Sequence, residues 1–209
     1  MSAQDSAPDG APRAFLVDDQ PAVLKALARL LAAEGIAVQS YGSAQDFLDS
    51  GQAGAPGCLV LDLSMPGMGG LALQQALAAQ DSLLPVVFLT GQGNIEAGVE
   101  AMKLGAADFL TKPVDGARLL LAVRAAFERN RLARAERAGR LAILVRLDSL
   151  TPREREVMDL LIEGLLNKQV AAALGTVEKT VKVQRARIML KMQVRSLTAL
   201  VRLVDRARA

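Results

Sequence analysis

The stretch Cys58–Gly70 reads CLVLDLSMPGMGG and joins a short apolar run to a loop rich in Pro and Gly. An apolar run of this length, bounded by such a loop, is typical of a buried strand. The run ends at Asp62, and a carboxylate is costly in a buried strand unless it is paired or bound to a metal. We therefore expect Asp62 to lie at the end of a strand and to face a site.

The composition of the chain excludes several classes of function. Among its 209 residues there is one Cys, so no internal disulfide can form, and this suits a reducing cytoplasm. There is no His, which excludes catalysis or metal binding by imidazole. Residues 1–12 are small and polar, do not resemble a signal peptide, and are expected to form a disordered tail. No apolar run approaches the roughly 20 residues of a membrane span, so we expect a cytoplasmic protein.

The charge is distributed unevenly along the chain. Residues 1–128 hold 7 Lys and Arg against 14 Asp and Glu, a net charge of −7. Residues 129–209 hold 18 against 8, a net charge of +10. An acidic half joined to a basic half predicts two domains with different partners, and the basic half is a candidate for binding nucleic acid.

The first half alternates short apolar runs with helical patterns. The strands are expected at 14–17, 37–40, 58–61, 85–89 and 107–110, and the helices at 21–34, 44–50, 70–80, 94–104 and from 115 onward. This alternation predicts an α/β domain over residues 13–128, with a doubly wound five-stranded parallel sheet.

The second half reads as helical throughout. Residues 129–147 are rich in Arg and are expected to form a helical linker, with Gly139 as a weak point. A seam of Leu in this segment could hold two chains together, although a plain linker is the simpler interpretation. From 148 to 209 we expect an all-α domain of four helices, at 152–163, 167–174, 178–191 and 196–207, the first with Thr151 as its N-cap.

Polar side chains follow four of the predicted strands. Asp18 and Asp19 follow the first strand, Asp62 the third, Thr90 the fourth and Lys112 the fifth. The carboxyl ends of parallel strands share one edge of a sheet, so these side chains should meet in one crevice. Three carboxylates imply a cation, and a site made only of oxygen ligands suits Mg²⁺. An Asp can also attack phosphorus to form an aspartyl phosphate, whose oxygens Thr90 and Lys112 would bind.

Four segments together resemble the receiver domain of bacterial two-component response regulators. They are FLVDDQP at 15–21, CLVLDLSMPGMGG at 58–70, VVFLTGQG at 86–93 and GAADFLTKPVD at 105–115. The resemblance implies that Asp62 is the phosphoacceptor and that Asp18, Asp19, Asp62 and the backbone carbonyl of Ser64 bind Mg²⁺. It also implies that Thr90 and Lys112 sense the phosphoryl group, that Phe109 is the switch aromatic, and that the Lys112–Pro113 peptide is cis.

The segments NKQVAAALG at 167–175 and TVEKTVKVQRARIMLKM at 176–192 predict a helix-turn-helix. The apolar residues expected to pack inward are Val170, Ala173, Leu174, Val177, Val181, Ile188 and Leu190. The segment from Leu150 to Met192 is similar to the LuxR-type DNA-binding domain of the FixJ/NarL response regulators. The DNA contacts expected from these two observations are Asn167, Lys168, Lys179, Thr180, Lys182, Val183, Gln184 and Arg187; a Gln can pair with adenine in the major groove.

These observations predict a transcription factor controlled by phosphorylation rather than an enzyme. A sensor histidine kinase would phosphorylate Asp62, and the chain would then form a homodimer on promoter DNA, as an activator with RNA polymerase as a further candidate partner. Two alternatives remain at this point. One is a Mg²⁺ phosphatase, which usually carries a second acid where this chain has Ser64. The other is a constitutive DNA-binding protein with an unphosphorylated receiver.

Overall fold

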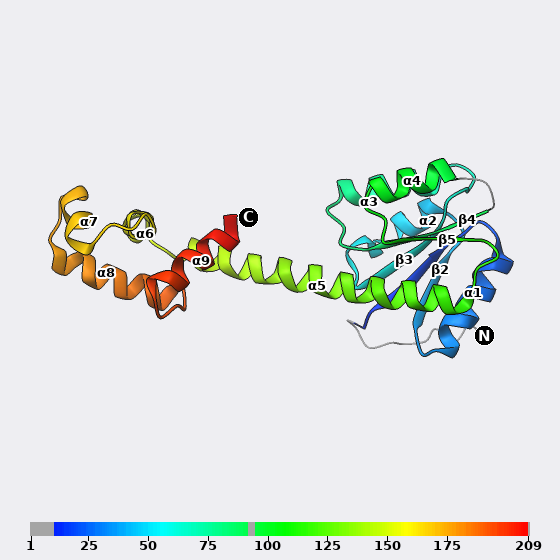
Figure 1. The fold of residues 1–209 in the computed structure, drawn as a ribbon, viewed down its shortest axis with the longest axis horizontal. Helices are drawn as coiled ribbons and strands as arrows, with labels where there is room; N and C mark the ends of the chain where they lie inside the picture. Colours follow the sequence, from blue (N-terminus) through cyan, green and yellow to red (C-terminus); the bar gives the residue numbers. More distant parts are fainter. Residues whose placement is uncertain (1–10, 92–94, 209) are drawn as a thin grey trace. The chain divides into compact units, whose positions relative to one another are not determined.

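A computed structural model describes residues 11–91 and 95–208 of the chain (Figure 1). Most of the predicted tail, residues 1–12, lies outside these ranges. Contacts within the chain divide it into two compact units, Met1–Arg134 and Ala135–Ala209, which we describe separately. Within the described residues, no helix is both long and apolar enough to cross a membrane.

The first unit is built on a parallel sheet of five strands in the order β2-β1-β3-β4-β5 (Figure 1). The strands are β1 (Arg13–Val17), β2 (Ala37–Tyr41), β3 (Gly57–Asp62), β4 (Val86–Thr90) and β5 (Asp108–Thr111). The helices between them are α1 (Pro21–Ala33), α2 (Ala44–Asp49), α3 (Gly70–Ala79) and α4 (Ile95–Lys103), with a short 3₁₀ turn at Gln52–Gly54, and α5 (Gly116–Asp148) follows β5. The doubly wound parallel sheet predicted from the alternating pattern is confirmed.

Alternate residues of the strands face opposite sides of the sheet and form two cores. Phe15, Leu59 and Phe88 pack against α2, α3 and α4 on one side. Leu16 and Val60 pack against α1 and the first turns of α5 on the other. Because both faces are covered, β3 is buried along its whole length, which explains its continuous apolar run.

The helix α5 runs without a break from Gly116 to Asp148, through Gly139, where the sequence indicated a weak point. The side chain of Asn130 fixes this helix to the sheet of the first unit. It is 2% exposed, accepts a hydrogen bond from the backbone N–H of Gly57 (3.1 Å) and donates one to the carbonyl of Leu83 (2.6 Å). Gly57 itself has φ +147°, and a Cβ there would collide with the backbone carbonyl of Arg13.

The second unit contains α6 (Pro152–Ile162), α7 (Asn167–Ala173), α8 (Glu178–Lys191) and α9 (Leu197–Arg208). Thr151 caps α6 as predicted, in a capping box with Glu154. Val170, Val181 and Ile188 are buried in one core, and Leu174 packs against it.

Three residues that we expected to pack inward are exposed. Val177 precedes α8 as its N-cap residue and is 64% exposed. Ala173 is exposed at the end of α7. Leu190 is 78% exposed because it lies nine residues after Val181, about 180° around the helix from the buried side. The prediction that these three residues belong to the core was wrong.

Candidate functional site

The predicted crevice forms at the carboxyl edge of the sheet in the first unit. The register pairs Val17 with Leu61 and Asp62 with Leu89, so β1, β3 and β4 end side by side. Asp18, directly after β1, is 1% exposed, and Asp62 is 4% exposed. The sequence therefore places two buried carboxylates next to each other, although burial of a charged carboxylate is unfavourable without a partner.

Lys112 provides that partner. Its ammonium Nζ lies 2.7 Å from Asp18 Oδ2 and 2.8 Å from Asp62 Oδ1. The remaining oxygens are also hydrogen-bonded, because the backbone N–H of Gln20 donates to Asp18 Oδ1 (2.9 Å) and that of Ser64 donates to Asp62 Oδ2 (3.2 Å). The Lys112–Pro113 peptide is cis, and that prediction is confirmed.

The electrostatics of the crevice keep Asp62 basic. Burial raises the pKa of Asp62 above its usual value, and the hydrogen bond from Lys112 opposes this only in part. Burial also works against the charged form of Lys112, but its hydrogen bonds to Asp18 and Asp62 outweigh the burial and raise its pKa. The arrangement is a buried carboxylate beside a firmly protonated ammonium, which suits nucleophilic attack on an electrophile that carries negative charge.

The donor chemistry of the crevice fits Mg²⁺. Asp18, Asp62 and the carbonyl of Ser64 offer hard oxygen ligands and no softer ones. Asp19, however, is exposed beside them, and among the described residues no three acidic or Cys side chains are grouped closely enough to hold a metal ion. In this conformation the ammonium of Lys112 compensates the two buried carboxylates.

The other two predicted site residues of the first unit, Thr90 and Phe109, lie on the paired strands β4 and β5. Thr90 ends β4 and is 3% exposed, and its hydroxyl donates to the carbonyl of Gly91 (3.1 Å). Phe109 in β5 is half-buried, and its ring lies against Gly98 of α4. A Cβ at Gly98 would lie 2.8 Å from Cζ of this ring, so the glycine makes room for the aromatic ring. We did not predict this role, although a Gly inside a helical pattern is a signal that could have suggested it.

The second unit exposes a basic face on α8. Lys179, Lys182 and Arg187 are exposed on it, together with Thr180 and with Val183, which is 47% exposed. Gln184 lies on the half-buried side, and its Oε1 is shielded without a hydrogen-bond partner among the described protein atoms. On α7, Lys168 is exposed, while Asn167 Oδ1 accepts a hydrogen bond from Arg185 (3.2 Å). The exposed residues of the predicted DNA-contacting set on α8 thus share one face of that helix, and Gln184 lies at its margin.

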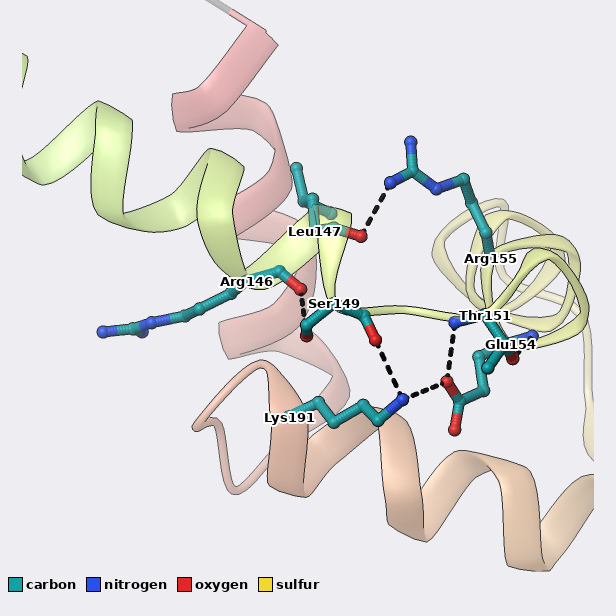
Figure 2. Close-up of polar contacts among 7 residues, drawn as sticks. All are labelled: Arg146, Leu147, Ser149, Thr151, Glu154, Arg155 and Lys191. Atoms are coloured by element: carbon teal, nitrogen blue, oxygen red, sulfur yellow. Dashed lines mark hydrogen bonds and ion pairs between the residues drawn. The ribbon is translucent and has the colours of Figure 1, made fainter.

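Figure 2 shows how the second unit fixes the end of α8. The ammonium of Lys191 donates to Glu154 Oε2 (2.6 Å) and to the carbonyl of Ser149 (2.9 Å). The same Glu154 oxygen accepts the backbone N–H of Thr151 (2.9 Å). Lys191 therefore joins the last turn of α8 to the start of α6 and to the residue that follows α5. We did not predict the contacts of Lys191, because Glu154 and Ser149 lie 37 and 42 residues before it in the sequence.

Comparisons with known proteins agree with both halves of this description. Residues 14–124 match the family model of the response regulator receiver domain, and residues 148–204 match that of the bacterial regulatory proteins of the luxR family. The chain is 44% identical to transcriptional regulatory protein FixJ of Azorhizobium caulinodans, over 90% of this chain and 89% of the relative. It is 43% identical to nodulation protein W of Bradyrhizobium diazoefficiens, over 91% of this chain and 84% of that protein.

Solved structures of response regulators also match the chain over most of its length. A low-resolution structure of the response regulator StyR matches with a TM-score of 0.85 and 43% identity, covering 93% of this chain and 98% of that one. Full-length FixJ from B. japonicum matches with a TM-score of 0.58 and 41% identity, covering 94% and 97%. The chain therefore belongs to the two-component response regulators of the FixJ type, in which a receiver domain is followed by a LuxR-type DNA-binding domain that controls transcription.

Proposed function

We propose that a sensor histidine kinase phosphorylates Asp62 and that this switches the chain from a resting form to a homodimer that binds promoter DNA and activates transcription. The observation that carries the proposal is the position of the Lys112 ammonium, 2.8 Å from Asp62 and 2.7 Å from Asp18 in a buried crevice. Receiver domains generally bind Mg²⁺ for phosphorylation. In this chain Asp18, Asp19, Asp62 and the Ser64 carbonyl would hold Mg²⁺, which supplies positive charge to the phosphoryl oxygens.

The residues of the crevice each have a part in the transfer. An oxygen of Asp62 attacks the phosphorus of a phosphohistidine, the new O–P bond forms, and the bond to the histidine nitrogen breaks. Lys112 already touches Asp62 and can donate to a phosphoryl oxygen without leaving the crevice. Thr90 would exchange its hydrogen bond to Gly91 for one to the phosphoryl group. This exchange moves the end of β4, and Phe109 and α4 follow it.

The surface that would change lies on α4, β5 and the first turns of α5. Val99 and Met102 of α4 are each 49% exposed, and with Gly98 and Phe109 they line an apolar groove. We propose that two phosphorylated receivers join there and bring two basic α8 helices to half-sites one DNA turn apart. The alternative is a permanent dimer held by the Arg-rich part of α5, in which phosphorylation changes only the affinity for DNA.

The first experiment treats the full chain with acetyl phosphate and measures its intact mass. We expect one added phosphoryl group in the presence of Mg²⁺, and none with chelator or in Asp62→Asn. Asp49→Asn changes an exposed carboxylate of the same domain and serves as the matched control, which should be labelled like the wild type. Equal labelling of Asp62→Asn and the wild type would refute the assignment of Asp62.

The second experiment follows assembly and DNA binding. Sedimentation of the full chain with and without beryllofluoride and Mg²⁺ should show a change from monomer to dimer, whereas a dimer under both conditions would support the permanent assembly. Selection from a random DNA pool should yield one preferred sequence that the phosphorylated chain binds more tightly. Reporter transcription from that sequence should rise with the kinase, and a fall would identify a repressor. A location in the cytoplasm, where kinase and DNA are both accessible, remains a prediction.

A further inference from the structure

The outward side of α8 carries an apolar stripe that no other described residue of the second unit covers. Val183, Ala186 and Leu190 lie at spacings of three and four residues, so they share one side of the helix. Val183 is 47% exposed and Leu190 is 78% exposed. The opposite side of α8 already fills the core through Val181 and Ile188. The stripe therefore has no structural role in the fold of this unit.

Single exposed apolar residues are common on protein surfaces and need no explanation. Several exposed apolar residues aligned on one side of a helix, when the other side already fills the core, indicate an interaction site. Such a stripe fits either an apolar partner helix or a surface that presents separate apolar groups. In the major groove of DNA, the only apolar groups on the base edges are the C5-methyl groups of thymine. An apolar side chain at that depth would distinguish thymine from the other bases.

The charges beside the stripe favour DNA over a second copy of this chain. Lys182 and Arg187 flank it on its two sides, and Lys179 precedes it by one turn. The only acidic residue of α8 is Glu178, in the first turn. Two copies packed along this stripe would bring these cations together, which is unfavourable, whereas DNA phosphates would be attracted to them.

We propose that Leu190, together with Val183, reads thymine methyl groups in the major groove and is a determinant of sequence specificity. This inference rests on the proposed function, because it requires α8 to enter the groove. Val183 and Leu190 are seven residues apart, so they are separated by roughly 10 Å along the helix axis. This distance corresponds to about three base-pair steps of DNA. The two side chains should therefore respond to methyl groups at two different positions, about three base pairs apart.

The test removes methyl groups from DNA one at a time. The full phosphorylated chain first selects its preferred site from a random pool, and this site is then made with deoxyuridine in place of each thymine in turn. Fluorescence anisotropy measures the affinity of the wild type, of Leu190→Ala and of Val183→Ala. Val145→Ala is the matched control, because Val145 is 70% exposed on α5, in the same unit but outside the proposed interface.

We expect the wild type to lose roughly four-fold in affinity for each methyl group that it contacts, the ratio that corresponds to transferring one such group from water. Leu190→Ala should bind the thymine and uracil forms of its own position equally and keep its response at the position of Val183. Val183→Ala should behave in the reverse manner, and Val145→Ala should match the wild type at every position.

Four outcomes would overturn the inference, and they are distinguishable. If the pool yields no preferred site, the proposed DNA-binding function fails and the inference fails with it. If a preferred site exists but replacing thymine by uracil changes the affinity at no position, only the inference fails. The same holds if Leu190→Ala keeps the full wild-type response. If Leu190→Ala instead converts a dimer to a monomer in sedimentation and leaves the methyl response intact, the stripe is an interface between copies of this chain.

Discussion

Replacing Lys191 with Met tests whether the cluster in Figure 2 holds the end of α8 in place. The change keeps an unbranched apolar chain and removes the ammonium that lies 2.6 Å from Glu154 and 2.9 Å from the Ser149 carbonyl. The side chain of Glu154 is only 6% exposed, so its charge would remain in a site that water reaches poorly. The second unit should therefore be less stable in this variant.

The exposed fractions of the Lys191 and Glu154 side chains determine how much stability is lost. Breaking a fully buried ion pair costs about 3–5 kcal/mol, while an exposed pair contributes about 0–1 kcal/mol. Lys191 is 33% exposed and Glu154 is 6% exposed, so this pair lies between the two cases. We expect Lys191→Met to lower the free energy of unfolding of the second unit by about 2 kcal/mol.

Hydrogen exchange followed by mass spectrometry measures this effect in the full chain. Peptides from 150–208 should exchange faster in Lys191→Met, while peptides from the receiver serve as an internal reference. Lys182→Met is the matched control, because its pair with Glu178 is exposed on both sides (63% and 44%) and should contribute less than about 0.5 kcal/mol. Equal protection in the two variants would refute the reasoning.

The same pair gives a prediction about pH. The hydrogen bond from Lys191 lowers the pKa of Glu154 below its usual value, and the backbone N–H of Thr151 adds to this. A carboxyl group whose pKa is lowered on folding stabilises the fold above its unfolded value, about 4.5, and loses that contribution as the pH falls through the folded value. The difference between Lys191→Met and the wild type should therefore shrink below pH 4.5, and a difference that stayed constant would contradict the pairing.

Three further predictions concern the receiver. Asn130→Ala removes both hydrogen bonds that tie α5 to Gly57 and Leu83, so it should lower the free energy of unfolding in urea by about 2–4 kcal/mol. The control Arg134→Ala loses one exposed hydrogen bond to the Gly54 carbonyl and should lower it by less than about 1 kcal/mol. Similar values for the two variants would contradict the anchoring role of Asn130. Asp62→Asn should raise the midpoint of thermal unfolding at pH 7. A carboxyl group whose pKa is raised on folding stabilises the fold below its unfolded pKa, and that stability is lost as the pH rises through the folded pKa. A lower midpoint would show that Lys112 needs both carboxylates. Burial raises the pKa of the Cys58 thiol to about 12, so iodoacetamide at pH 8 should modify this thiol only after unfolding. Modification of the folded chain within minutes would be evidence against the buried strand.

Local patterns in the sequence were sufficient for most of the fold. Short apolar runs gave the strands because β3 and its neighbours are buried on both faces, and the ends of these runs located Asp18, Asp62 and Lys112 on one edge. Periodicity failed where a residue lies outside the regular helix or turns away from the core, as Val177 and Leu190 do. An exposed apolar side chain and a buried one look alike in a sequence.

Contacts between distant residues could not be predicted from such patterns. Asn130 and Gly57 are 73 residues apart, and Lys191 and Glu154 are 37 apart. The helix α5 also continues through Gly139, although Gly is unfavourable in a helix interior. A Cβ at Gly139 would lie 3.3 Å from the guanidinium of Arg206, so the missing side chain leaves room for a neighbour that comes much later in the sequence.

The backbone at Gly57 has a consequence for how this chain can vary. No other residue fits there, because any Cβ would strike the carbonyl of Arg13 in the neighbouring strand, and the N–H of the same residue holds Asn130. In a library of all single substitutions, position 57 should lose every variant, and position 130 should retain few. The residue at position 130 of the long helix is therefore tied to the backbone of one glycine at the start of the central strand, so positions 57 and 130 cannot vary independently.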